Sequence, residues 1–264
     1  MKRTRTRRMK LTRDNYYSSE ANRAYWSASF VKAMLRCPAA ALAELRGEYR
    51  QPETPALLVG SYVDSYFEST EAHEAFCTGH PQIFGKSGKL KAEYVQADKM
   101  IRRAEEDSVF MEYLRGEKQV IRTGAIDGIP FKAKLDVYLP GERIVDLKTV
   151  RDMEPVYSPG QGRISFAEYW NWPMQLAIYQ ELCGEKVPCY LAVITKQDPP
   201  DIAVVQIPQN MLDAEMELLR LKLPYLDAVR QGIVEPERCG KCTWCRQSKE
   251  LTGAVSLEQF IEIS

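Results

Sequence analysis

The stretch FKAKLDVYLPGERIVDLK, residues 131–148, does most to limit what this chain can fold into. Apolar and polar residues alternate on both sides of a Pro-Gly pair, the pattern of two short strands joined by a turn. Because side chains alternate along a strand, Asp136 lies on a polar face of the first strand, and Asp146 shares a face of the second with Lys148. If the strands pair, the two aspartates meet at one end of a sheet.

Two carboxylates with a lysine beside them form a set of hard ligands that suits Mg²⁺ or Mn²⁺ better than zinc. Such an ion would polarise a phosphate and lower the pKa of a bound water. Lys148 would orient the attacking water or stabilise the developing charge. The alternative is an exposed hairpin whose acids and lysine form surface ion pairs, and the three residues alone do not decide between them.

Composition restricts the remaining possibilities only moderately. The 264 residues are 45% hydrophobic and 27% charged, which fits one α/β domain with insertions or at most two small ones. The chain has only two histidines, which argues against a histidine-rich zinc hydrolase and against a Ser-His-Asp catalytic triad. No apolar run approaches the length of a membrane span, and the N-terminus lacks the apolar core of a signal peptide. We therefore expect a cytoplasmic protein that does not contact a membrane.

Charge is unevenly distributed, although 36 basic and 36 acidic residues give a net charge of zero. The first ten residues, MKRTRTRRMK, contain six basic residues and no acid. We expect residues 1–14 to form a flexible basic arm, which is either solvated or in contact with DNA phosphates. Residues 15–264 are expected to form a single domain that ends in a cysteine cluster.

Periodicity along the chain predicts helices before and after a small mixed β-sheet, an α/β (α+β) arrangement with one core. A proline inside the first helical segment marks a kink or the start of a second helix. The segment 153–165, rich in Pro and Gly, is expected to be a mobile flap. Helices are expected at 27–47, 54–70, 91–116, 166–184 and 209–232, and strands at 118–123, 131–148, 187–196 and 201–208.

The central stretch resembles the PD-(D/E)xK nuclease superfamily, whose signature is an acid on one strand followed by an acid and a lysine on the next. Asp136, Asp146 and Lys148 match it here. The following helix carries Q-x3-Y, at Gln175 and Tyr179, and the chain closes with CGKCTWCRQSKEL. This ordered set, over roughly residues 27–251, is similar to the RecE-type exonucleases of phages and prophages.

The resemblance implies a restriction-endonuclease-like core and assigns roles to the matching residues. Asp136 and Asp146 would be metal ligands, with the carbonyl of Leu147 as a third oxygen. Lys148 would be the catalytic lysine.

Further positions match the superfamily around this core. Gln175 and Tyr179 would position the phosphate or the lysine. Glu117 stands where relatives often carry an additional acid near the metal. The sequence GSYVD resembles a G-x3-H motif whose histidine binds metal, and here Asp64 occupies the histidine position.

Seven cysteines, an odd number without a signal peptide, argue against a disulfide framework. Cys239, Cys242 and Cys245 form C-x2-C-x2-C, for which Cys37 is the best fourth ligand, and free thiols are the alternative. One early and three late cysteines resemble the iron-sulfur nucleases of the helicase-nuclease and CRISPR-adaptation groups. An Fe₄S₄ cluster is favoured over zinc, and either would join the two ends of the chain.

The leading hypothesis is a Mg²⁺- or Mn²⁺-dependent DNA exonuclease of the RecE type, encoded by a phage or prophage in a bacterial host. It would act on double-stranded DNA ends as a homo-oligomer and yield single-stranded DNA for an annealing protein. One alternative is an iron-sulfur nuclease of the CRISPR-adaptation or helicase-associated type. Another is a catalytically inactive DNA-binding scaffold, which the missing motif histidine allows.

Overall fold

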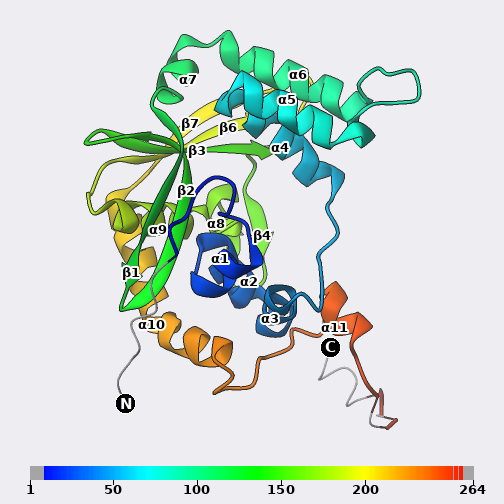
Figure 1. The fold of residues 1–264 in the computed structure, drawn as a ribbon, viewed down its shortest axis with the longest axis vertical. Helices are drawn as coiled ribbons and strands as arrows, with labels where there is room; N and C mark the ends of the chain where they lie inside the picture. The colour runs from blue at the N-terminus through cyan, green and yellow to red at the C-terminus, as the bar shows by residue number, and fades with distance from the viewer. Residues whose placement is uncertain (1–8, 252, 255, 258–264) are drawn as a thin grey trace.

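A computed structural model of the chain describes residues 9–251, 253, 254, 256 and 257. Its centre is a five-stranded mixed sheet with the strand order β1-β2-β3-β6-β7, flanked by helices (Figure 1). The predicted fold class is therefore confirmed. The strands of this sheet are β1 (Glu117–Ile126), β2 (Ile129–Leu139), β3 (Arg143–Val150), β6 (Cys189–Thr195) and β7 (Ile202–Ile207).

The helices begin where short polar side chains can cap them. Ser27, Thr54 and Ser69 each accept a hydrogen bond from a backbone N–H in the first turn. No helix in the described part of the chain is long and apolar enough to cross a lipid bilayer. The helices are α1 (Ser19–Ala24), α2 (Ala28–Arg36), α3 (Pro38–Arg46), α4 (Pro55–Glu68), α5 (Thr70–Gly79), α6 (Ala92–Glu105), α7 (Ser108–Tyr113), α8 (Phe166–Tyr169), α9 (Trp172–Cys183), α10 (Gln209–Arg230) and α11 (Thr243–Gln247), with a 3-10 turn at Pro81–Ile83.

Two of the predicted helices are each divided into two. The segment 91–116 breaks at Asp107, whose carboxylate accepts the N–H of Phe110 and so starts α7. The segment 166–184 breaks at Asn171, whose φ of 52° is left-handed. Asp107 favours the first break by capping the new helix, and Asn171 favours the second because asparagine tolerates the left-handed conformation. Apolar periodicity continues across both breaks. The first helical segment ends at Cys37 and restarts at Pro38, as predicted.

Helices cover both faces of the sheet (Figure 1). On one face, α2, α9 and α10 pack against Leu135, Ile144 and Leu191. On the other, α4, α6 and α7 pack against a second buried cluster that includes Val145 and Ile194. The strand β6 is therefore covered on both of its faces, which explains its nearly continuous apolar sequence.

The chain enters β6 parallel to β3, whereas the other neighbouring strands are antiparallel. The connection between them contains a small hairpin of β4 (Val156–Ser158) and β5 (Gly162–Ile164), which occupies the predicted flap, and then α8 and α9. Parallel neighbours require such a crossover, and here it lays α9 on the sheet face beside β1, β2 and β3.

The sheet opens into a fork between β2 and β3. The two strands pair only from Val137 with Val145 to Leu139 with Arg143. Continuing that register by one residue places Asp136 opposite Asp146. At this point the strands have separated and no longer pair through their backbones. Instead, the backbone N–H of Leu147 on β3 donates to the side chain of Asp136 on β2 at 3.0 Å. The fork brings the two predicted aspartates together.

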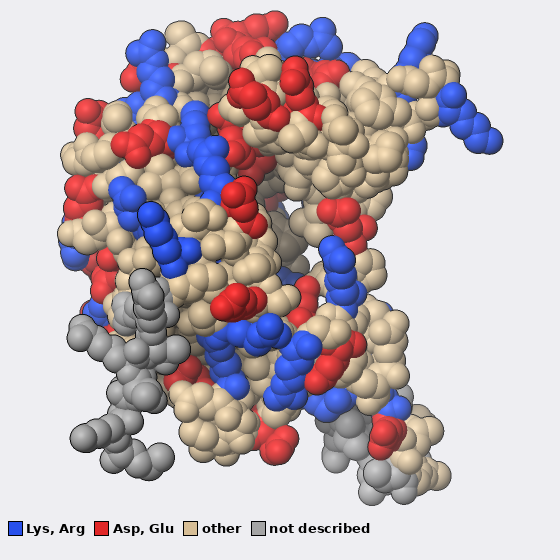
Figure 2. All heavy atoms as spheres, in the orientation of Figure 1, with Lys and Arg blue, Asp and Glu red and all other residues tan. Residues whose placement is uncertain are grey.

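The segment before α2 lies against β2 on the side of the lysines. Backbone hydrogen bonds of 2.8 Å run from Trp26 N to Pro130 O and from Lys132 N to Trp26 O. Residues 1–8 of the predicted basic arm lie outside the described residues. In the remainder, Arg13 donates to the carbonyl of Lys118 at 3.0 Å, and Met9 accepts from the Tyr25 hydroxyl at 2.9 Å. Figure 2 shows basic and acidic side chains interspersed over this face.

Substituting Gly116 tests the packing at the start of β1. Its φ is 138°, and a Cβ there would lie 2.8 Å from the backbone oxygen of Tyr138, which the sheet holds in place. We expect Gly116→Ala to lower the free energy of unfolding by roughly 3 kcal/mol, measured by urea denaturation. Gly141→Ala is the matched control, because Gly141 has a φ of 74° with no atom near its Cβ. It should cost only about 1 kcal/mol, and equal losses would contradict the steric argument.

Candidate active site

Asp146 on β3 is the most deeply buried acid of the site, with 1% of its surface exposed. Its Oδ1 accepts a hydrogen bond of 2.9 Å from Gln175 Nε2. Its Oδ2 forms an ion pair with Lys148 Nζ at 2.5 Å. The ammonium of Lys148 therefore compensates the charge of this buried carboxylate.

Asp136 lies across the fork from Asp146. Besides the N–H of Leu147, its carboxylate is approached by Gln119 Nε2 at 3.4 Å. Burial raises the pKa of Asp136 well above its usual value, and the carboxylates of Asp64 and Asp146 raise it further. Three acids therefore share one site and repel one another.

Asp64, from α4, reaches the same place. With Asp136 and Leu147 it lines a cavity of about 10 Å³, room for roughly one water molecule. The pKa of Asp64 is raised to about 6, mainly by burial, with Lys148 opposing the rise and Asp146 supporting it. The residue at the motif-histidine position thus lines the same cavity as Asp136.

Glu117 is not one of the residues that line this cavity. It is exposed at the first position of β1, opposite Tyr138. Glu68 lines the cavity instead, one turn after Asp64 on the same face of α4. Sequence analysis missed Glu68, although its spacing of four residues from Asp64 was a usable signal.

Gln175 and Tyr179 lie one turn apart on α9 and act together, as the Q-x3-Y spacing predicts. Gln175 Nε2 donates both to Asp146 and, at 3.0 Å, to the Tyr179 hydroxyl. Lys32 Nζ on α2 donates to Gln175 Oε1 at 2.6 Å. Because an ammonium can only donate, Lys32 fixes the amide with its oxygen towards α2 and its nitrogen towards Asp146.

Lys32 and Gln119 are site residues that sequence analysis missed. Burial lowers the pKa of Lys32 to about 8, and the neighbouring Lys148 lowers it further while Asp146 opposes. Gln119 has a left-handed φ of 54°, and its buried Oε1 has no hydrogen-bond partner among the described residues. Such backbone outliers concentrate at functional sites. No local sequence pattern predicts either residue, because each is placed at the site by tertiary packing.

These residues fit a hard divalent cation. The donors are all oxygens, namely Asp136, Asp146 and the carbonyl of Leu147, to which Lys148 Nζ lies at 3.2 Å. Burial and the neighbouring carboxylates raise the pKa of Asp136, so its charged form is not fully compensated by the protein. A cation would stabilise that form, and Asp64 lines the same cavity as Asp136.

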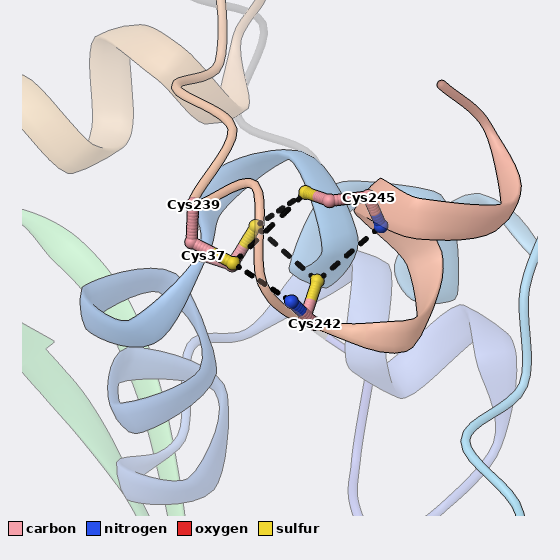
Figure 3. A group of neighbouring side chains, drawn as sticks. All are labelled: Cys37, Cys239, Cys242 and Cys245. Atoms are coloured by element: carbon pink, nitrogen blue, oxygen red, sulfur yellow. Dashed lines mark hydrogen bonds between the residues drawn. The ribbon is translucent and has the colours of Figure 1, made fainter. Parts of the chain in front are cut away.

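The predicted cysteine group is assembled as expected (Figure 3). The four Sγ atoms of Cys37, Cys239, Cys242 and Cys245 all lie within 4.8 Å of one another. Backbone N–H groups point at two of them, from Cys242 to Cys239 Sγ at 3.3 Å and from Cys245 to Cys242 Sγ at 3.4 Å. Burial opposes ionisation of Cys239, but the backbone N–H groups outweigh it and lower its pKa to about 6. Burial raises the pKa values of Cys242 and Cys245, so Cys239 is the thiol of the group that ionises most easily.

The sulfur separations bear on which metal fits. Sγ of Cys37 lies 3.5 Å from that of Cys245 and 3.9 Å from that of Cys242. A single tetrahedral ion with metal–sulfur bonds of about 2.3 Å places its ligands about 3.8 Å apart. In an Fe₄S₄ cluster each cysteine binds a different iron, which demands wider spacing. The geometry therefore fits one tetrahedral ion such as zinc better than the cluster that the sequence favours.

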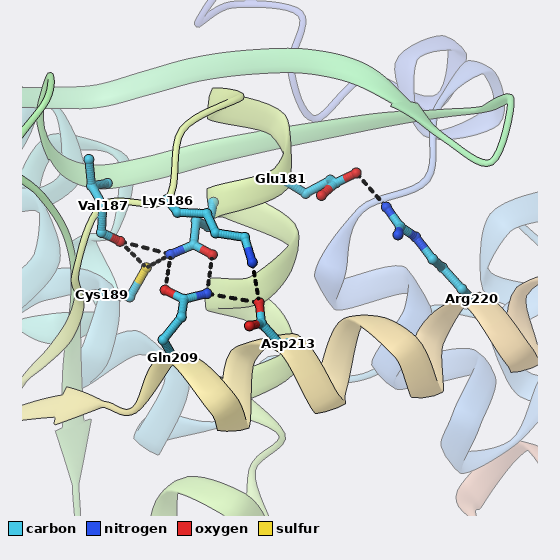
Figure 4. A network of polar contacts seen from close by, with 8 residues as sticks. Glu181, Lys186, Val187, Cys189, Gln209, Asp213 and Arg220 are labelled. Carbon is cyan, nitrogen blue, oxygen red and sulfur yellow. Dashed lines mark hydrogen bonds and ion pairs between the residues drawn. The ribbon is translucent and has the colours of Figure 1, made fainter.

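Two anchors hold the helices that carry Lys32 and Gln175. Cys37 ends α2, so the cysteine group fixes that helix at its C-terminal end. On α9, Gln180 forms a reciprocal pair with Gln209 of α10 through two hydrogen bonds of 2.9 Å, and Gln209 also donates to Asp213 (Figure 4). Both helices are thus fixed by contacts that lie outside the active site.

Removing one carboxylate of the fork tests the predicted metal site. We expect Asp146→Asn to abolish the binding of Mn²⁺, measured by isothermal titration or by the electron-spin signal of the free ion, because one anionic oxygen ligand is lost. Asp127→Asn is the control, since Asp127 is exposed in the β1–β2 turn and asparagine accepts its left-handed φ of 49°. Undiminished Mn²⁺ binding by the Asp146 variant would contradict the assignment.

Comparison with known proteins shows the family of this chain. Residues 27–248 match the family described as a PDDEXK-like domain of unknown function, DUF3799. A crystal structure named "Putative exonuclease", from Eubacterium rectale, is 38% identical over 96% of this chain and 98% of that chain, with a TM-score of 0.92. The structure of SSO0001 is 16% identical over 73% of this chain and 85% of that chain, with a TM-score of only 0.28. No curated protein matches significantly in sequence. The chain belongs to the PDDEXK-like family DUF3799, within the PD-(D/E)xK nuclease superfamily.

Proposed function

We propose that this protein is a metal-dependent DNA exonuclease that hydrolyses phosphodiester bonds from duplex ends and yields single-stranded DNA for recombination. The observation that carries the proposal is the β2–β3 fork, where the strands separate beside Asp136 and Asp146 and Lys148 forms an ion pair of 2.5 Å with Asp146. The name of the relative from Eubacterium rectale, an exonuclease, supports the same reaction class.

The fork would hold Mg²⁺ or Mn²⁺ through Asp136, Asp146 and the carbonyl of Leu147. When bound, the ion supplies charge neutralisation at the phosphate and a more acidic water. Burial disfavours the charged form of Lys148, but the carboxylates of Asp146 and Asp136 outweigh it and raise the Lys148 pKa. Lys148 therefore stays an ammonium at neutral pH, able to orient the attacking water and to stabilise charge on the phosphate.

The surrounding residues keep this arrangement in place. Lys32 orients the Gln175 amide, and Gln175 in turn orients Asp146. Burial raises the pKa of Tyr179 well above its usual value, so its hydroxyl stays protonated and can donate to a phosphate oxygen. The site thus offers one ammonium and one hydroxyl to the substrate beside its carboxylates.

Within this proposal we place the protein in the RecE-type group, phage- or prophage-encoded and cytoplasmic in a bacterial host. It would act on double-stranded DNA ends as a homo-oligomer and pass the single strand to an annealing protein. The support is the ordered set of Asp136, Asp146, Lys148, Gln175 and Tyr179, which the structure gathers at the fork. An iron-sulfur nuclease and an inactive scaffold are the alternatives that the experiments below distinguish.

A degradation assay tests the nuclease and the catalytic lysine together. End-labelled linear duplex should be degraded in Mg²⁺ and not in EDTA. We expect Lys148→Ala to lower the rate by about 10²–10³-fold, the usual cost of removing one preorganised donor of charge stabilisation. The control is Lys186→Ala. Lys186 is an exposed lysine that forms an ion pair with Asp213 on α10. Degradation unchanged in the Lys148 variant would refute the site, and DNA binding without degradation by the wild type would favour the scaffold.

Metal analysis tests the cysteine group. We propose one zinc ion bound by Cys37, Cys239, Cys242 and Cys245, with an Fe₄S₄ cluster as the alternative. Anaerobically purified protein should be colourless and contain about one zinc per chain, and Cys37→Ser should lower this content. Brown protein with iron and acid-labile sulfide would refute zinc and restore the iron-sulfur hypothesis.

A further inference from the structure

A cavity of about 340 Å³ opens beside the fork, large enough for a small ligand. One wall is the segment before and into α2, including Tyr16, Tyr17 and Phe30, and the opposite wall is β2, with Lys132 and Lys134. Tyr179, which contacts Gln175 in the active site, also lines it. The cavity therefore reaches the candidate active site from the side of the N-terminal segment.

The wall formed by the N-terminal segment is fixed in place. Lys132 is buried, and its ammonium is held by the carbonyl of Tyr16 and, at 2.7 Å, by Asn22 Oδ1. The same ammonium lies 4.5 Å from the centre of the Tyr16 ring. The Tyr16 ring is consequently held in place before a ligand arrives.

The cavity presents a ring and a cation to an incoming group. Tyr17 is 68% exposed, and its ring packs edge-on against Tyr16 at 4.9 Å. The Lys134 ammonium lies 4.9 Å from the centre of the Tyr17 ring and has no hydrogen-bond or ion-pair partner in the described part of the chain. Glu44 is the one acid in the lining, so the lining has a net positive charge.

The ammonium of Lys134 belongs to the same strand face that leads to Asp136 at the fork. Lys134 precedes Asp136 by two residues on the same face of β2, a distance of about 7 Å along the strand. That is close to one phosphate step of an extended nucleic-acid strand. Tyr179, which lines the cavity, accepts a hydrogen bond from Gln175, and Gln175 also donates to Asp146, so the cavity borders the residues of the fork.

We propose that this cavity binds the unpaired nucleotide next to the scissile phosphate, with its base against Tyr17 and its phosphate at Lys134. A base pair is too bulky for a cavity of this size, whereas one nucleotide fits. A ring beside a cation is the recognition pattern of sequence-independent single-strand binding. The inference rests on the proposed nuclease function and adds that the strand enters the site unpaired.

Fluorescence anisotropy in EDTA tests the cavity without catalysis. The probes are a short fluorescein-labelled oligo(dT) and a blunt hairpin duplex. We expect Tyr17→Ala to weaken oligo(dT) binding about tenfold, the usual cost of losing one base–ring stack, and to change duplex binding little. Tyr17→Phe keeps the ring and should bind like the wild type. Lys134→Gln should weaken oligo(dT) binding and reduce its dependence on salt, because one phosphate contact is lost.

The control is Tyr225→Ala, which removes a partly exposed tyrosine on α10 outside the cavity and should leave oligo(dT) binding unchanged. In Mg²⁺, the wild type should degrade a duplex with a mismatched end several-fold faster than a fully paired one, and Tyr17→Ala should lose this advantage.

The two proposals fail separately. If the wild type degrades duplex but Tyr17→Ala binds oligo(dT) as tightly as the wild type, the cavity proposal is overturned and the nuclease stands. If no DNA is degraded while Tyr17→Ala still loses oligo(dT) affinity, the cavity binds a strand and the nuclease proposal falls.

Discussion

The parallel pairing of β3 with β6 is the constraint on which the site depends. A parallel neighbour cannot be reached by a tight turn, so the chain must leave the sheet after Val150 and cross back over one face. The returning helix is α9. It passes over β3 where Asp146 is buried, and Gln175 and Tyr179 therefore face the fork. Without this crossover the aspartates would lie in an open hairpin, the alternative that the sequence alone left standing.

The fork concentrates charged groups in a buried place. Asp64, Asp136 and Asp146 converge on it. Four lysines act on these carboxylates, namely Lys32, Lys118, Lys134 and Lys148. Burial raises the pKa values of Asp64 and Asp136, and repulsion between the carboxylates raises them further. Carboxylates perturbed in this way are typical of functional sites, and a divalent cation would stabilise their charged forms.

Much of this arrangement could be predicted from local patterns. The alternation of residues 131–148, the spacing of Gln175 from Tyr179 and the pairing of Cys37 with three late cysteines all survive in the structure. Lys32 could not be predicted, because its place beside Gln175 depends on how α2 packs against α9. The exposure of Glu117 has a backbone cause: the left-handed φ at Gln119 interrupts strand alternation, so Glu117 does not follow Gln119 into the site.

The cysteine group and the active site are joined by one helix. Cys37 ends α2, its N–H donating to Ala33 at 2.9 Å, and Lys32 lies five residues earlier, about 7.5 Å along the helix axis. Cys37 Sγ is in turn 3.5 Å from Cys245, near the other end of the described chain. An ion held by the four sulfurs would therefore fix the register and tilt of α2. Since Lys32 sets the orientation of Gln175, and Gln175 that of Asp146, a metal far from the fork would help to shape it.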